Sequence, residues 1–102
     1  MTNMTMSRCN MIMTEFRLTS KGGFAEVKVS FAPGGKKWTL AANFVPLEQR
    51  EFVDALDRAL PFEAIAKDGR GGCIIFGFMP ENMGRPEVLE RIIDVFEDTI
   101  KD

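Results

Sequence analysis

Residues 24–44, F-A-E-V-K-V-S-F-A-P-G-G-K-K-W-T-L-A-A-N-F, decide the fold. Apolar and polar side chains alternate through both halves of this stretch, and successive side chains of a β-strand point to opposite faces of a sheet. The glycines of A-P-G-G-K between the halves suit a tight turn, where positive φ angles are common. The stretch therefore predicts an antiparallel β-hairpin with one buried face.

A third alternating segment, M-T-E-F-R-L-T at residues 13–19, precedes the hairpin and is joined to it by S-K-G-G. Residues 13–44 are therefore expected to form a three-stranded antiparallel meander. The side chains expected on its buried face are Phe16, Leu18, Ala25, Val27, Val29, Phe31, Trp38, Leu40, Ala42 and Phe44.

The apolar period changes at Pro46, which suits the first turn of a helix. Helical spacing then predicts a helix that ends before Pro61 and buries one stripe, formed by Phe52, Val53, Leu56, Ala59 and Leu60. Two further strands are expected at residues 62–67 and 73–79. The second is apolar at both parities, which indicates an interior strand covered on both faces, with Phe76 and Phe78 in the core.

A second helix is expected after Pro86, with a wide apolar face that covers the sheet. The order of strands and helices predicts an α+β two-layer sandwich, with a mostly antiparallel sheet and both helices packed on one face. We expect residues 13–102 to form a single domain. Residues 1–12 are expected to be a flexible N-terminal extension with several possible starting methionines, since their longest apolar run is too short for a signal peptide.

The composition sets further limits. A chain of 102 residues, 45% apolar and 27% charged, is typical of one globular domain, and without a run of 18 apolar residues no membrane partner is expected. Cys9 and Cys73, in a chain without histidine, supply too few soft ligands for zinc. We therefore expect no metal and no cofactor, and the sparse cysteines favour a reducing cytoplasm.

The glycine-rich stretch K-D-G-R-G-G-C-I-I-F-G-F-M-P at residues 67–80 invites comparison with phosphate-binding and RNA-binding motifs. A phosphate-binding loop follows a strand and opens a helix, whereas these glycines lie between two strands. The aromatic positions of the RNA-binding sheet motif fall on Gly72, Ile74 and Gly77, which cannot stack on bases. The prediction is a turn with Arg70 at its tip.

Enzymatic chemistry is not indicated. Histidine and tyrosine are absent, and Cys73 has no obvious activating base. The carboxylate pairs, such as Asp54 with Asp57, are spaced as on a solvated helix face. We therefore expect no catalytic residues and a protein that is not an enzyme.

The charge is divided unevenly along the chain. Residues 1–45 carry six basic and two acidic side chains, whereas residues 46–102 carry seven and thirteen. Charge complementarity of this kind orients a partner. The first hypothesis is therefore a small non-enzymatic interaction protein that binds and modulates, in one version inhibits, another macromolecule through acidic helices or an exposed sheet face. The acidic residues expected to bind a protein partner are Glu87, Glu90, Asp94, Glu97 and Asp98.

The alternative is a weak single-stranded nucleic-acid binder that uses the basic meander, because phosphate contacts depend on lysine and arginine. The residues expected to contact the anion are Arg17, Lys28, Lys36, Lys37 and Arg70. A homodimer is also open, through an unpaired sheet edge or the uncovered face.

Overall fold

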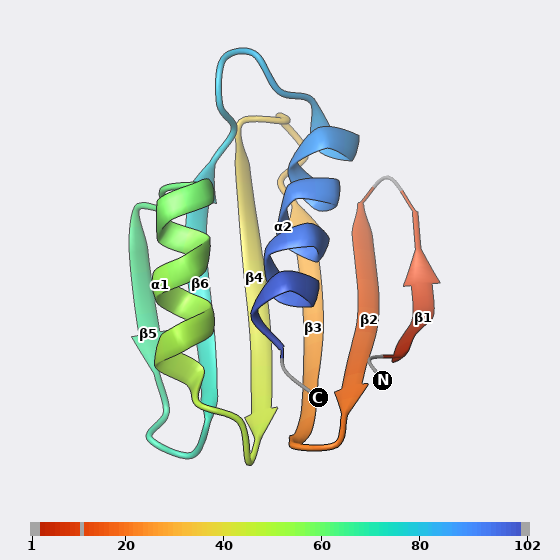
Figure 1. Ribbon diagram of the computed structural model, residues 1–102. Coiled ribbons are helices and arrows are strands. Elements are labelled where there is room, and N and C mark those ends of the chain that lie inside the picture. The colour runs from red at the N-terminus through yellow and green to blue at the C-terminus, as the bar shows by residue number, and fades with distance from the viewer. Residues whose placement is uncertain (1–2, 11, 101–102) are drawn as a thin grey trace.

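The structure is a computed structural model that describes residues 3–10 and 12–100 (Figure 1). In chain order its elements are β1 (Asn3–Cys9), β2 (Met13–Ser20), β3 (Gly23–Phe31), β4 (Lys37–Val45), α1 (Gln49–Ala59), β5 (Ala64–Lys67), β6 (Gly72–Phe78) and α2 (Arg85–Thr99).

The strands form one antiparallel sheet in the order β1-β2-β3-β4-β6-β5, and both helices lie against the same face of it (Figure 1). This confirms the predicted α+β two-layer sandwich. The meander of residues 13–44 is present as β2, β3 and β4, and the hairpin β5–β6 adds to the free edge of β4.

The core lies between the sheet and the helices. Every meander side chain expected to be buried is buried. Three aromatic rings join the layers, since the ring centroid of Phe44 lies 4.7 Å from that of Phe52 and 6.0 Å from that of Phe96. The two helical rings are 5.4 Å apart and meet edge to face, a favourable arrangement for aromatic pairs.

Helix α1 begins at Gln49, three residues later than Pro46, because the Glu48 side chain accepts a hydrogen bond from the Arg50 N–H and caps the helix there. Its buried residues include Phe52, Val53 and Leu56. Helix α2 has Pro86 in its first turn, as expected, and buries Val88, Ile92 and Phe96 against the sheet.

Within the predicted flexible extension of residues 1–12, the structure describes a strand that the sequence did not predict, whereas residues 1, 2 and 11 lie outside the described residues. Asn3–Cys9 form the edge strand β1, which pairs with β2 along most of its length and has an irregularity in register between Met6 and Arg8. Met4 and Met6 lie opposite Leu18 and Phe16, so they share the helical face. All of β1 is exposed, and its polar and methionine composition made it resemble a tail.

The prediction for β6 was half wrong. Its interior place, between β4 and β5, is confirmed. However, Cys73 and Ile75 point into the core, whereas Ile74, Phe76 and Phe78 are exposed on the other face. Both helices pack on one side of the sheet, so nothing among the described residues covers these three side chains.

Candidate interaction surface

The face of the sheet opposite the helices is open, and strand register fixes which side chains share it. Residues directly opposite each other in an antiparallel pair point to the same face. Phe76 lies opposite Thr39 of β4 and Ala64 of β5, and Ile74 lies opposite Ala41 and Ala66. The open face therefore has large apolar side chains on β6 and small side chains on both of its neighbours.

Ile74, Phe76 and Phe78 form what we call the apolar ridge. They occupy alternate positions of β6 and are 42%, 43% and 49% exposed. Isolated exposed apolar residues are common on proteins, but a contiguous row marks a candidate interaction site. At one end of the ridge, Lys37 lies opposite Phe78 and its ammonium is 3.8 Å from the carboxylate of Glu63.

Beside the ridge, β4 presents Thr39, Ala41 and Asn43, which we call the small-residue strip. Residues Thr39 and Ala41 are partly buried, because the flanking strands carry longer side chains. A low strip thus runs alongside a high ridge. These two features lie on neighbouring hydrogen-bonded strands.

The β2 and β3 part of the open face is charged. Glu15 lies opposite Lys28, and Arg17 lies opposite Glu26, so signs alternate both along and across these strands. We call these four residues the charged quartet. The Arg17 guanidinium also sits 3.9 Å from the ring centroid of Phe24, a cation–π contact that fixes its position.

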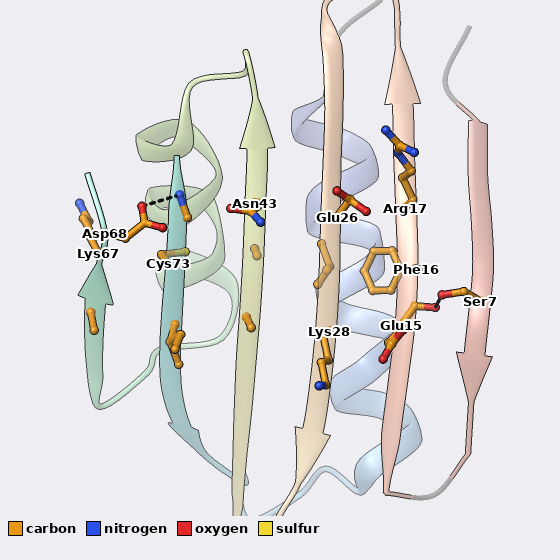
Figure 2. A pocket seen from close by; sticks show the side chains of 16 residues that line it. Ser7, Glu15, Phe16, Arg17, Glu26, Lys28, Asn43, Lys67, Asp68 and Cys73 are labelled. Carbon is orange, nitrogen blue, oxygen red and sulfur yellow. Dashed lines mark hydrogen bonds between the residues drawn. The ribbon is translucent and has the colours of Figure 1, made fainter. Parts of the chain in front are cut away.

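A shallow hollow of about 590 Å³ spans the open face from the quartet to β5 and β6. Figure 2 shows Glu26, Lys28 and Asn43 around it, with Asp68 on the opposite rim. Its walls carry both signs of charge, and Ala41 and Gly72 are among its lining residues. A wide, shallow depression of this kind fits a protein surface better than a small molecule, whose sites usually enclose most of the ligand.

The glycine-rich stretch is the β5–β6 turn, as the sequence indicated. Gly69 and Gly71 have φ angles of 76° and 94°, and a Cβ on Gly71 would lie 2.7 Å from the Phe44 carbonyl oxygen. The Asp68 carboxylate accepts hydrogen bonds from the N–H groups of Arg70 and Gly72, at 2.7 and 3.0 Å. These two bonds lower the pKa of Asp68 below its ordinary value.

The structure places the acidic residues of the first hypothesis together on the outside of α2. These exposed residues are Glu87, Glu90, Asp94, Glu97 and Asp98. They belong to the helical layer and are therefore on the side of the molecule away from the apolar ridge.

The residues expected to contact an anion do not converge. Lys36 and Lys37 lie at the β3–β4 turn, whereas Arg70 lies beyond the opposite end of β6. Arg17 and Lys28 are on the open face, but each has a glutamate directly opposite it. Interleaved carboxylates would repel a phosphate backbone, so the arrangement offers no continuous basic track.

The thiol of Cys73 is buried, and burial raises its pKa, so it stays protonated at neutral pH. Residues 3–10 and 12–100 contain no group of three or more side chains placed to hold a metal ion. Neither described helix has the length and apolar character needed to cross a membrane.

The ridge was not found from the sequence, although the signal was present. Ile74, Phe76 and Phe78 alternate with Cys73, Ile75 and Gly77, so one of the two sets had to face away from the helices. Helices on one side of the sheet leave its other side uncovered, so the predicted fold itself implied an exposed apolar face on β6.

Comparison with known proteins gives no further guide. No family model matches this chain, and neither a curated protein nor a solved structure is similar enough to count as a match. The apolar ridge and the charged quartet are therefore the features that bear on function.

Proposed function

We propose that this protein is a small non-enzymatic interaction protein whose open sheet face binds another macromolecule and modulates it. The observation that carries the proposal is the apolar ridge: three large side chains in a row, each more than 40% exposed, on an uncovered sheet. Transfer of apolar surface out of water supplies about 25 cal/mol per Å², so covering this row favours association.

The charged residues have a second role in this proposal. The charged quartet borders the ridge with both signs of charge, and such rims fix the orientation of a partner more than they add affinity. The acidic surface of α2 would attract a basic protein to the helical side of the molecule instead, and the helix variant below tests that second surface. We further propose a cytoplasmic location, because Cys9 is exposed and neither Cys9 nor Cys73 forms a disulfide.

The experiment is capture of partners from the native host by tagged protein, with and without nuclease. Three forms are compared: wild type, the ridge variant Ile74→Ser/Phe76→Ser, and the helix variant Glu90→Lys/Asp94→Lys/Glu97→Lys. The expected result is nuclease-resistant capture of a protein by the wild type, lost in the ridge variant. Because all five substituted positions are exposed, both variants are expected to stay folded.

The two variants separate the two surfaces. Loss of capture in the helix variant alone would indicate that the binding site lies on α2, as the first hypothesis from the sequence predicted. Loss of capture on nuclease treatment would favour the nucleic-acid alternative, as would a low-salt affinity for single-stranded oligonucleotides that falls steeply with added salt. Equal capture by all three forms would contradict the proposal.

A further inference from the structure

We propose that the open sheet face is occupied by a second copy of this chain, in a twofold face-to-face dimer. The apolar ridge of each copy lies on the small-residue strip of the other. This inference rests on the proposed function, because it identifies the partner of the same surface.

The first argument is shape. The ridge of Ile74, Phe76 and Phe78 and the strip of Thr39, Ala41 and Asn43 lie side by side on β6 and β4. A twofold axis that runs along the strands between β4 and β6 exchanges these two strands. It therefore places Phe76 and Ile74 of each copy over Thr39 and Ala41 of the other, so that one rotation makes both sets of contacts. Phe78, at the end of the ridge, lies over Lys37 of the other copy. Sheets that pack face to face bring their side chains together in this way.

The second argument is charge. Within the bounds of α1 and α2 there are four basic and eight acidic side chains, a net charge of −4. Two copies that met through their helices would bring two such layers together, and like charges repel. The quartet on the open face has two basic and two acidic side chains and no net charge. The open face is thus the side on which two copies can approach each other.

The third argument is that the open face is poorly suited to two other classes of partner, an anionic polymer and a basic protein. An anionic polymer would meet Glu15 and Glu26 between the basic residues, and a basic protein would be drawn to α2 on the other side. An apolar ridge beside a matching strip, with balanced charge around it, is most complementary to itself.

The area of the interface indicates how strongly two copies associate. In this arrangement β4 of each copy lies over β6 of the other, and β3 lies over the shorter β5. At about 4.8 Å per strand and roughly 3.3 Å per residue, the overlap is about 350 Å² for each copy. The total, about 700 Å², is below the size of stable specific interfaces and fits only a weak association. We therefore infer a weak dimer with a dissociation constant in the micromolar range, about 1–100 μM.

The test is the molar mass of the purified full chain by light scattering, between about 1 μM and about 1 mM protein. The wild type is expected to pass from 11.5 kDa to twice that mass as concentration rises. Phe76→Lys and Thr39→Glu are each expected to weaken association about 30-fold or more, as at a central interface residue. Asp94→Lys, on the helical side, is the matched control and should dimerise like the wild type.

A mixture then tests the pairing. The twofold dimer has two contacts between position 76 of one copy and position 39 of the other. In a mixed dimer of Phe76→Lys and Thr39→Glu chains, one of these contacts pairs the new lysine with the new glutamate, and the other is the wild-type contact of Phe76 with Thr39. Equimolar mixing is therefore expected to restore association at concentrations where each variant alone is still a monomer. Circular dichroism melting of each variant alone, expected to match that of the dilute wild type, shows that loss of association is not loss of fold.

Several results would overturn the dimer. A wild type that stays at 11.5 kDa up to about 1 mM has no such interface. Variants that dimerise unchanged would place the interface elsewhere, for example at the β1 edge. A mixture that stays monomeric would refute the ridge-on-strip pairing. A monomeric wild type that still captures a host protein through Ile74 and Phe76 would refute the dimer and leave the proposed function intact.

Discussion

Gly77 shows how one missing side chain positions the largest core residue. It lies opposite Trp38 in the β4–β6 pair, and a Cβ on Gly77 would lie 2.0 Å from the indole ring. The indole N–H donates to the Phe78 carbonyl oxygen at 3.1 Å, which holds the ring against β6 at Gly77. A glycine is therefore required at position 77, because any side chain there would overlap the indole ring.

Gly77→Ala is expected to lower the free energy of unfolding by about 3 kcal/mol, the upper part of the range for overpacking, because the buried indole must move. Chemical denaturation monitored by tryptophan fluorescence measures it. Gly34→Ala is the control, since a Cβ there meets no atom within 4 Å. A loss of stability no larger than that of the control would show that the indole has room to move.

Asp68 makes the free energy of unfolding depend on pH in the acidic range. Its folded pKa is lowered by the N–H groups of Arg70 and Gly72, so the unfolded chain binds its proton more readily. The stabilisation is thus present above the ordinary carboxyl pKa of 3.8 and is lost as pH falls through the lower, folded pKa.

We expect urea denaturation to show that, below pH about 4, the wild type loses more stability with falling pH than Asp68→Asn does, because asparagine does not titrate. Asp57→Asn, on the exposed side of α1, is the matched control. Parallel pH profiles for the wild type and Asp68→Asn would rule out this role for the turn.

Among the elements, β1 lies at the edge of the sheet and is exposed along its whole length, but Met4 and Met6 lie opposite Leu18 and Phe16 on the helical face. Removal of residues 1–9 is expected to leave a cooperative fold whose free energy of unfolding falls by about 1–2 kcal/mol, as for lost partial burial of two methionines. Thermal and urea melts measure it. A chain that no longer unfolds cooperatively would make β1 part of the core.

The elements also show what the sequence could predict. Strands β2, β3 and β4 follow from strict alternation, and both helices follow from their apolar stripes. Pro86 lies in the first turn of α2 as predicted, whereas α1 begins only at Gln49, after Pro46. Strand β1 was missed because an exposed edge strand has little apolar pattern. The outer face of β6 was misassigned because residues apolar at both parities do not say whether a second layer covers them.

At the scale of the whole molecule, the candidate site exists because, among residues 3–10 and 12–100, the sheet has six strands and both helices lie on one side of it. The sequence predicted that layer arrangement and the exposed acidic positions of α2. It also implied that one apolar set of β6 would lie on the open face. It could not predict that small side chains would flank this set on both sides, because that depends on the strand order β4-β6-β5.

If the open face dimerises, the melting temperature should rise with protein concentration, because association stabilises only the folded chain. Calorimetry at about 10 μM and about 500 μM is expected to show this shift for the wild type and Asp94→Lys but not for Phe76→Lys. A melting temperature independent of concentration in all three would argue against self-association.

Helix α2 follows every strand in the chain, and this has a consequence during translation. Until Val88, Ile92 and Phe96 have left the ribosome, the apolar side of a nascent meander lacks its main cover. The apolar side of β2, β3 and β4 therefore stays partly exposed to solvent until α2 has been synthesised. A chaperone that binds extended apolar segments should associate with ribosome-bound chains that stop before residue 85 and release them once α2 has emerged.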